Sequence, residues 1–221
     1  MKNIGLIGCG NIAETYFRAQ EYFNNINFVA CADINLDAAK KTAEQYNIIP
    51  LSVDEILNDK NVDIILNLTI PQAHYEISKR ALEANKHVYC EKPMSVKFDD
   101  AKDLLNLASK KSLYIGNAPD TFLGGGGQQA RKIIDNNEVG QILTGNFIFA
   151  FPGVQDFHPN PESWFQEGGG PVIDMGPYFF TTLVNLLGPA KNIRGRGAKF
   201  FEKREYKAGP KKGQTFNVDI P

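Results

Sequence analysis

The sequence is poor in the residues that build disulfide frameworks and metal sites. Its 221 residues include only three cysteines, three histidines and one tryptophan. An odd number of cysteines without metal-ligand spacing argues against a disulfide framework and against a zinc site, and the histidines are dispersed. No apolar run is long enough to span a membrane. We therefore expect no metal site and no membrane partner.

An excess of charge of one sign is also lacking. Twenty-four Lys and Arg residues face 25 Asp and Glu residues, for a net charge of −1, so nothing favours binding to nucleic acid or to an anionic membrane. The residues before Ala13 already form a predicted strand and turn, so we expect no signal peptide. Cys9, Cys31 and Cys90 lie in or beside predicted strands and are interpreted as small buried residues. A reducing, cytoplasmic location fits this cysteine usage.

A glycine turn near the N-terminus is the most informative stretch. Gly8–Ala13 (GCGNIA) follows an apolar run and opens a helical pattern, which is the context of a dinucleotide-binding fingerprint. Gly8 would allow the tight turn, and Gly10 would let the backbone approach a pyrophosphate. The free N–H groups at the helix start would face the phosphates. The alternative is an ordinary turn between a strand and a helix. The cofactor contacts expected here are Gly8, Gly10, Asn11 and Ile12.

A carboxylate follows the second apolar run. Asn27–Ala32 ends at Asp33, 23 positions after Gly10, which is near the spacing expected for a ribose-binding carboxylate. Such a side chain accepts hydrogen bonds from the adenosine ribose and repels a 2′-phosphate, which favours NAD over NADP. The alternative is an aspartate that only caps the following helix.

Predicted strands and helices alternate through the first half of the chain. The strands are expected at Asn3–Ile7, Asn27–Ala32, Val62–Leu68, His87–Cys90 and Leu113–Ile115. The helices are expected after the glycine turn and at Ala38–Tyr46, Asp54–Asn58, Gln72–Ala84 and Phe98–Lys111. This alternation predicts an α/β domain over residues 1–118, a doubly wound parallel sheet of Rossmann type. Ligands bind such sheets beyond the carboxyl ends of the strands. The glycine turn, Asp33, Thr69–Pro71 and Glu91–Pro93 all lie there.

The composition changes near residue 118. Four consecutive glycines at 124–127 indicate a domain junction. Residues 119–221 are expected to form an incomplete α+β domain. Its elements are a helix Gln128–Asn136, a strand Ile142–Phe151, a long loop Pro152–Gly170, a helix Val172–Leu187 and strands Ile193–Phe201 and Thr215–Ile220. A loop of this length is usually functional or disordered.

Five motifs together resemble the Gfo/Idh/MocA family of oxidoreductases, which includes glucose–fructose oxidoreductase and inositol dehydrogenase. Glu91-Lys92-Pro93 is the most specific of them, and Thr69–His74 resembles a family segment in which proline and histidine stand one residue further on. The others are Gly8–Ala13, Ala32-Asp33 and Gly168–Tyr178. The resemblance covers the whole chain and about the N-terminal two thirds of the family. It implies a substrate domain with an open, mostly antiparallel sheet over residues 119–221.

The family's chemistry is reversible hydride transfer between a nicotinamide cofactor and a hydroxyl carbon of a sugar, a polyol or a related hydroxy or keto compound. The resemblance implies NAD as the cofactor, with NADP less favoured. A hydroxyl that loses hydride from its carbon must also lose a proton to a nearby base. Lys92 is the first candidate for that proton transfer and for polarising the substrate. The further cofactor contacts expected are Thr69, Pro71, His74, Glu91, Lys92 and Pro93, with a structural role left open for His74.

Asp174 and Tyr178 stand four positions apart in a predicted helix, so we expect them on one face. Many family members have Asp and His at this spacing. A tyrosine in place of that histidine can still donate a hydrogen bond or exchange a proton, so the base assignment stays open between Lys92 and Tyr178. Tyr178 as a packed aromatic and Asp174 as a helix-start carboxylate remain the alternatives. His158 and Trp164 of the long loop are candidate substrate contacts.

Two functions follow from the resemblance. The first is an NAD-dependent dehydrogenase acting on CH–OH groups. The second is an NAD(P)-binding protein without turnover, either a truncated relic or a regulatory sensor. Family members continue beyond the point matching Pro221, and their open sheet often forms an oligomer interface. We therefore expect a C-terminally truncated chain that forms a homo-oligomer through the second-domain sheet.

Overall fold

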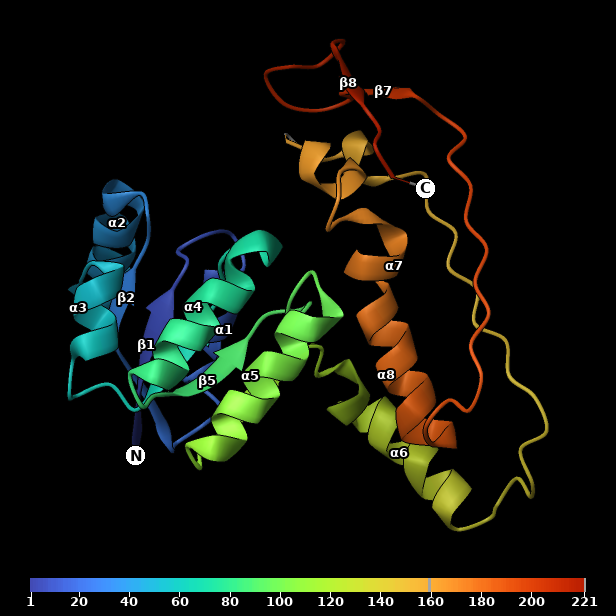
Figure 1. Cartoon of the computed structure of the whole chain (residues 1–221), viewed down its shortest axis with the longest axis horizontal. Helices are drawn as coiled ribbons and strands as arrows, with labels where there is room; N and C mark the ends of the chain where they lie inside the picture. Colours follow the sequence, from blue (N-terminus) through green and yellow to red (C-terminus); the bar gives the residue numbers. More distant parts are fainter. Residues whose placement is uncertain (159, 221) are drawn as a thin grey trace. The chain divides into compact units, whose positions relative to one another are not determined.

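The computed structural model describes residues 1–158 and 160–220 (Figure 1). Pro159, within the long loop expected above, and Pro221 lie outside the described residues. The chain divides into two compact units, Met1–Ala118 and Pro119–Pro221. Each unit is described by itself below.

The first unit is built on a six-stranded parallel sheet with the order β3-β2-β1-β4-β5-β6. The strands are β1 (Lys2–Ile7), β2 (Ile26–Ala32), β3 (Ile49–Pro50), β4 (Ile64–Asn67), β5 (His87–Cys90) and β6 (Ile115–Asn117). The chain builds outward from β1 to β3 and then returns to the other side of β1 to build β4 to β6. The point where the order reverses is therefore between β1 and β4, which is where such sheets bind their ligands.

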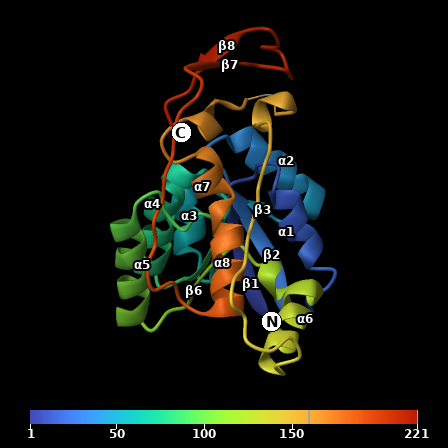
Figure 2. The same ribbon diagram turned by 90° about the vertical axis from the view of Figure 1, so that its right-hand side faces the viewer.

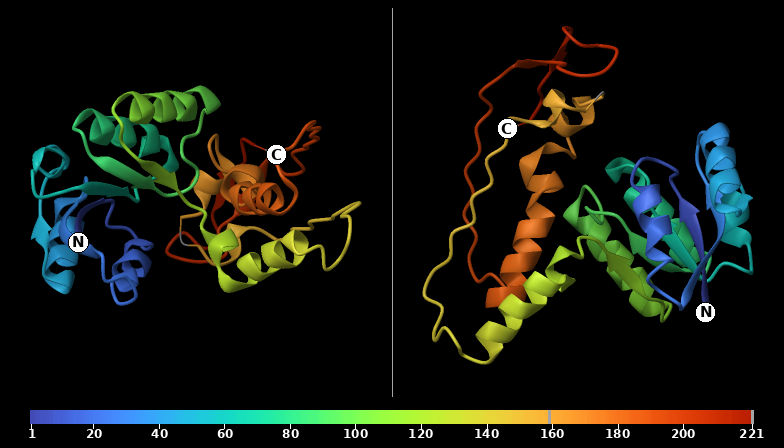
Figure 3. Two further views of the ribbon diagram at one scale, coloured as in Figure 1. Left: turned by 90° about the horizontal axis from the view of Figure 1, so that it is seen from below. Right: turned by 180° about the vertical axis from the view of Figure 1, so that it is seen from behind.

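Helices cover both faces of this sheet. They are α1 (Ala13–Ala19), α2 (Leu36–Tyr46), α3 (Val53–Asn58), α4 (Pro71–Glu83) and α5 (Phe98–Lys110). Side chains of α1 and α2 pack with Leu66 on one face, and side chains of α3, α4 and α5 pack with Ile65 on the other. Figure 3 shows α4 and α5 side by side, away from α1. Ile65 and Leu66 are successive residues of β4, and successive residues of a strand face opposite sides of the sheet. Helices therefore cover both faces of a parallel sheet, and the expected doubly wound fold is confirmed.

Local capping explains where several helices begin. Ser52 and Glu55 form a capping box at the start of α3, as their spacing in the sequence indicates. The Asn35 side chain accepts hydrogen bonds from two N–H groups of the first turn of α2. Pro71 occupies the first turn of α4, where its missing N–H costs nothing. The first turns of α2, α3 and α4 define where the loops that follow β2, β3 and β4 end.

The second unit contains helices and one small sheet. Its elements are η1 (Thr121–Leu123), α6 (Gly125–Asp135), η2 (Val154–Asp156), η3 (Glu162–Phe165), α7 (Gly170–Asp174), α8 (Gly176–Leu187), β7 (Lys203–Glu205) and β8 (Thr215–Asn217). The strands β7 and β8 pair antiparallel. Helix α6 packs against α8 (Figure 2). Arg131 of α6 donates hydrogen bonds to the carbonyl oxygens of Asn185 and Leu186 near the end of α8. Within the described ranges, no helix has the length and apolarity needed to cross a bilayer.

Two strands predicted for this unit are not formed. Residues 142–151 and 193–201 have no regular secondary structure, and β7 begins only at Lys203. A strand needs a neighbour to receive its backbone hydrogen bonds, and the described part of the chain supplies none to these segments. Rings of the first segment instead contact Phe179 of α8: Phe147 at 4.2 Å and Phe149 at 5.3 Å between centroids.

The single helix predicted over Val172–Leu187 is also wrong, because it is two helices. Helix α7 ends at Asp174, Met175 lies between, and α8 begins at Gly176. Pro177 has no N–H to donate to the carbonyl of Ile173, and its ring would clash with that carbonyl in a continuous helix. The proline therefore interrupts the helix one turn after it starts.

Candidate functional site

The turn after β1 requires its glycines for two different reasons. Gly8 donates its N–H to the Ala32 carbonyl at 2.9 Å and has a φ of +105°, which only glycine adopts readily. A Cβ on Gly8 would lie 2.6 Å from the carbonyl carbon of Leu68. A Cβ on Gly10 would meet no atom within 4 Å. Gly8 is thus fixed by close packing against the backbone that leaves β4, whereas Gly10 faces open space that a ligand can approach.

Asp33 connects this turn to the end of β2. Its Oδ2 accepts a hydrogen bond from the Cys9 N–H at 2.7 Å, and its Oδ1 accepts one from the Asn35 N–H at 2.8 Å. A carboxylate oxygen has two lone pairs, so each oxygen can accept a further hydrogen bond from a hydroxyl group. The exposed residues Asn11 and Ile12 lead into α1, whose first turn has no side-chain cap. These features fit a dinucleotide, with phosphates at the turn and a ribose at Asp33.

A buried asparagine organises the loop that follows β4. Asn67 is fully buried, and its Oδ1 accepts hydrogen bonds from the N–H and the hydroxyl of Thr69, at 3.2 and 2.7 Å. Its Nδ2 donates to the His74 carbonyl at 3.1 Å and to the Ser78 hydroxyl at 3.0 Å. The end of β4 and the first turns of α4, which begins at Pro71, are therefore held together by one side chain.

His74 links that loop to the next one. Its ring is 1% exposed, with Nδ1 2.6 Å from the Pro93 carbonyl oxygen and Nε2 2.8 Å from the Thr69 carbonyl oxygen. A carbonyl oxygen only accepts, so each contact is a hydrogen bond when the facing nitrogen carries a proton. His74 thus lies beneath the two loops and touches both of their backbones.

Glu91 anchors the loop that follows β5. Its Oε1 accepts a hydrogen bond from the Tyr16 hydroxyl at 2.8 Å, and its Oε2 accepts one from the Lys92 N–H at 2.9 Å. The Asn117 Nδ2 donates to the Glu91 carbonyl at 3.0 Å. Lys92 and Pro93, joined by a cis peptide bond, are half-buried. The loop carrying Lys92 is therefore held from α1 and from β6.

Sequence reasoning missed two of these supports. In the sequence, Tyr16 belongs to the apolar pattern of the helix after the glycine turn, and Asn117 stands where the composition begins to change. Tyr16 and Glu91 are 75 positions apart, and no local pattern announces a hydrogen bond over that separation. The side chains that hold the Lys92 loop are visible only in the folded sheet.

The candidate residues of the second unit form two groups. The rings of His158 and Trp164 lie 4.4 Å apart between centroids, at 57°. Asp174 ends α7, whereas Tyr178 belongs to α8 and donates its N–H to the Met175 carbonyl. The single helix expected to carry both residues is therefore wrong, and the Gly176-Pro177 pair was the signal for the break.

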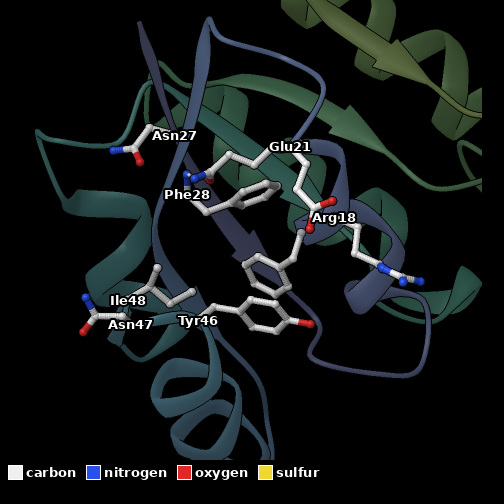
Figure 4. Close-up of a pocket in the computed structure, with 9 residues that line it drawn as sticks. Arg18, Glu21, Asn27, Phe28, Tyr46, Asn47 and Ile48 are labelled. Carbon is white, nitrogen blue, oxygen red and sulfur yellow. Dashed lines mark hydrogen bonds between the residues drawn. The ribbon is translucent and has the colours of Figure 1, made fainter.

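A separate hollow of about 440 Å³ lies at the other end of β2 (Figure 4). The rings of Phe17 and Tyr46 stack there at 3.9 Å, and Asn27 and Phe28 line it from the amino end of the strand. The glycine turn and Asp33 are at the carboxyl end, so this hollow is not part of the candidate site. Over residues 1–158 and 160–220, no group of three or more His, Cys, Asp or Glu side chains is arranged to hold a metal ion.

Comparison with known proteins agrees with this geometry. Residues 2–117 match the family model "Oxidoreductase family, NAD-binding Rossmann fold", and residues 128–218 match "GFO/IDH/MocA C-terminal domain". An uncharacterised oxidoreductase of Schizosaccharomyces pombe is 31% identical over 152 residues, covering 67% of this chain and 40% of the relative. D-xylose dehydrogenase of Paenarthrobacter nicotinovorans is 26% identical over 178 residues, covering 77% and 46%.

A solved structure shares the fold. The NAD-binding oxidoreductase of Klebsiella pneumoniae superposes with a TM-score of 0.71 at 26% identity, over 85% of this chain and 53% of that one. The chain thus spans about half the length of the proteins it matches, or somewhat less. The two family models together cover most of both units, and the resemblance carried by the motifs is confirmed. The chain belongs to the Gfo/Idh/MocA family of oxidoreductases, and its first unit has the family's NAD-binding Rossmann fold.

Proposed function

We propose that the whole protein is an NAD-dependent dehydrogenase that acts on a CH–OH group of a sugar or polyol. The observation that carries this proposal is the hydrogen bond from the Cys9 N–H to Asp33, which puts a carboxylate beside the glycine turn. A carboxylate there accepts ribose hydroxyls and repels a 2′-phosphate, so it favours NAD over NADP. The similarity to D-xylose dehydrogenase supports a sugar as the substrate class.

The cofactor contacts follow the carboxyl edge of the sheet. Gly8, Gly10, Asn11 and Ile12 hold the phosphates, and Asp33 holds the adenosine ribose. Thr69, Pro71 and the Glu91–Pro93 loop border the nicotinamide end, with His74 acting through the backbones of Thr69 and Pro93. When bound, the nicotinamide supplies the carbon that accepts or returns the hydride.

Lys92 moves or stabilises the proton of the reacting hydroxyl. The Lys92 N–H donates to Glu91, and Glu91 is in turn held by Tyr16. The backbone from which the Lys92 side chain extends therefore has a defined position. A positioned ammonium group can donate a hydrogen bond to the substrate oxygen, and its neutral form can take the proton. Asp174 and Tyr178 of the second unit are the proposed partners in this step, with Tyr178 as the other candidate base.

His158 and Trp164 are proposed as substrate contacts. Their rings are within contact distance of each other, and the His158 Nδ1 accepts the Asn160 N–H at 3.1 Å. That hydrogen bond leaves Nε2 as the ring nitrogen available to a hydroxyl group. The indole N–H of Trp164 adds a second donor of the kind that sugar hydroxyls accept.

Lys92→Met tests the enzymatic proposal. We expect kcat to fall by at least about 100-fold, because the proton-transfer group is removed, while the dissociation constant for NADH, measured by fluorescence, changes little. Lys97→Met is the matched control, because Lys97 is an exposed lysine five positions further along the same segment. Both variants are assayed for NADH formation with a panel of aldoses and polyols.

The outcomes separate the two functions. Full activity in Lys92→Met would overturn the role of Lys92. NADH binding by the unaltered protein without turnover of any panel member would replace the dehydrogenase by a cofactor-binding protein. Absence of NADH binding would overturn both functions.

We further propose a homo-oligomer that forms through the second unit, in the cytoplasm. Large apolar side chains of the 142–151 segment support an interface, because Leu143 and Ile148 are 84% and 86% exposed. Light scattering of Ile148→Lys against the unaltered chain tests the interface, and an unchanged mass would overturn it.

The cytoplasmic location is supported by the cysteines. The free thiols of Cys9, Cys31 and Cys90 suit a reducing compartment.

A further inference from the structure

The two cysteines beside the glycine turn lie next to each other. Cys9 stands between Gly8 and Gly10, is half-buried, and points its Sγ at the Ala32 carbonyl oxygen, 3.6 Å away. Cys31 is the residue before Ala32 and is fully buried. Ile7 pairs with Ala32 in the sheet, so Cys9 follows the end of β1 beside the end of β2, where Cys31 is the last residue but one.

Both sulfur atoms face helix α2. The Cys31 thiol is 3.3 Å from the Ala39 carbonyl oxygen, and the Cys9 sulfur is approached by the side chains of Cys31 and Thr42. Cys9 keeps part of its surface exposed, whereas Cys31 has no exposed surface. The arrangement is an accessible thiol with a second, protected thiol behind it.

The pKa values of the two thiols are shifted in opposite directions. Hydrogen bonding from the Cys31 thiol, with a smaller contribution from Thr42, lowers the pKa of Cys9 despite burial and the negative charge of Asp33. The same hydrogen bond, followed by burial, raises the pKa of Cys31. Cys9 is therefore the thiol that ionises first and the better nucleophile at neutral pH.

We propose that Cys9 and Cys31 form a redox-modification site in the glycine turn, in which a hydroperoxide oxidises Cys9 and Cys31 then closes a Cys9–Cys31 disulfide. An accessible, ionisable thiol beside a resolving thiol is the arrangement that redox-sensing cysteines use. The hydroperoxide is the oxidant, with hydrogen peroxide as the simplest member of the class.

One disulfide and two waters form from two thiols and one hydrogen peroxide. The Cys9 thiolate attacks one oxygen of hydrogen peroxide, an S–O bond forms, the O–O bond breaks, and the departing hydroxide takes up a proton to become water. The Cys31 sulfur then attacks the Cys9 sulfur, and the S–O bond breaks as the S–S bond forms. The thiol proton of Cys31 leaves with the hydroxyl group as a second water. Two electrons pass from the two sulfurs to the peroxide.

The consequence for the cofactor rests on the proposed function. The Cys9 N–H donates a hydrogen bond to Asp33, and Cys9 itself lies between Gly8 and Gly10. A covalent bond at Cys9 Sγ ties the turn to β2 and alters the geometry with which its N–H groups meet a phosphate. We expect the disulfide to weaken NADH binding about tenfold, and bound NADH to slow the oxidation of Cys9.

Peptide mapping of the whole chain tests the site independently of the cofactor. After mild hydrogen peroxide and alkylation of the remaining thiols, mass spectrometry should find a Cys9–Cys31 cross-link that dithiothreitol removes. Cys31→Ala should give a Cys9 sulfenic acid trapped by dimedone, and Cys9→Ser should give no cross-link. Cys90→Ala is the control that keeps the cross-link, because Cys90 is fully buried and its pKa is raised to about 12.

Three outcomes of the peptide mapping would overturn the redox site. Oxidation of Cys90 at the rate of Cys9, a cross-link only between separate chains, or oxidation of Cys9 without a cross-link would overturn the site. Fluorescence titration with NADH before and after oxidation tests the coupling, and an unchanged affinity would overturn that part. If the reduced protein binds no NADH while the cross-link forms, the proposed function fails and the redox site stands.

Discussion

The hydroxyl of Tyr16 donates a 2.8 Å hydrogen bond to Glu91, so the first helix after the glycine turn holds the loop that carries Lys92. The other carboxylate oxygen of Glu91 accepts the Lys92 N–H. One side chain thereby couples the proposed phosphate end of the candidate cofactor site to its proposed nicotinamide end. This contact explains why a tyrosine on an otherwise apolar helix face keeps its polar group.

Tyr16→Phe isolates that hydrogen bond. The ring remains, so we expect a loss of about 1.5 kcal/mol in the free energy of unfolding, as for a hydrogen bond to a charged acceptor. We also expect kcat to fall about tenfold, because Glu91 no longer fixes the Lys92 backbone. Urea denaturation and NADH-formation assays measure the two effects.

Tyr22→Phe is the matched control, since Tyr22 is 79% exposed. It should alter stability by less than about 0.5 kcal/mol and leave kcat unchanged. Equal kcat values for Tyr16→Phe and the unaltered protein would show that Glu91 is positioned without Tyr16.

The first unit was largely predictable because its signals are local. A glycine that must adopt a φ of +105° and a carboxylate at the end of β2 are features of short segments, and apolar runs mark the parallel strands. The same runs do not encode strand order, and the two-residue β3 is too short to show a pattern. The supports from Tyr16, Asn67 and Asn117 depend on which strands become neighbours.

The second unit was less predictable because its segments depend on distant partners. Residues 142–151 have the composition of a strand, yet a strand exists only when another strand pairs with it. The helix break at Met175 was readable from Pro177, but the apolar periodicity on both sides concealed it. Composition indicates what a segment prefers, and pairing decides what it becomes.

Asp33→Ser tests the cofactor preference. The serine removes the negative charge that repels a 2′-phosphate and the acceptor for the ribose hydroxyls, so the ratio of kcat/KM for NAD over NADP should fall at least about tenfold. Asp37→Ser, at an exposed position in the first turn of α2, is the control. An unchanged ratio in Asp33→Ser would remove Asp33 from the ribose site. Because Asp33 also accepts the Cys9 N–H, circular dichroism should first establish that the variant is folded.

Asp63 should make the free energy of unfolding depend on pH. The hydrogen bond from the Asn3 N–H, at 2.9 Å, and then Lys2, at 3.2 Å, lower the pKa of Asp63 in the folded state. A lowered folded pKa adds stability that is present above the unfolded value, about 3.9, and is lost as the pH falls through the folded value. Asp63→Asn should therefore cost about 0.5 to 1 kcal/mol at pH 7, a modest loss because the carboxylate is 37% exposed.

Urea denaturation at pH 7 and pH 3 checks this prediction, and the difference between Asp63→Asn and the unaltered chain should shrink at the lower pH. Lys2→Gln removes only the exposed ion pair and should cost less than about 0.5 kcal/mol at pH 7. A difference of the same size at both pH values would contradict the assignment of the charge effect to Asp63.

His74 is the junction between the Thr69 and Pro93 loops, and its removal should disturb both. His74→Leu removes the contacts of the ring with the Thr69 and Pro93 carbonyl oxygens, so we expect a loss of about 1 to 3 kcal/mol in the free energy of unfolding. His74→Gly opens a buried space of imidazole size, and added imidazole should restore part of kcat if the ring positions the loops. His87→Gln is the control, because His87 lies at the opposite end of β5 and should not change NADH affinity. Failure of imidazole to raise kcat in a folded His74→Gly would limit His74 to packing, since a positioning role requires that a ring in contact with both carbonyl oxygens be sufficient.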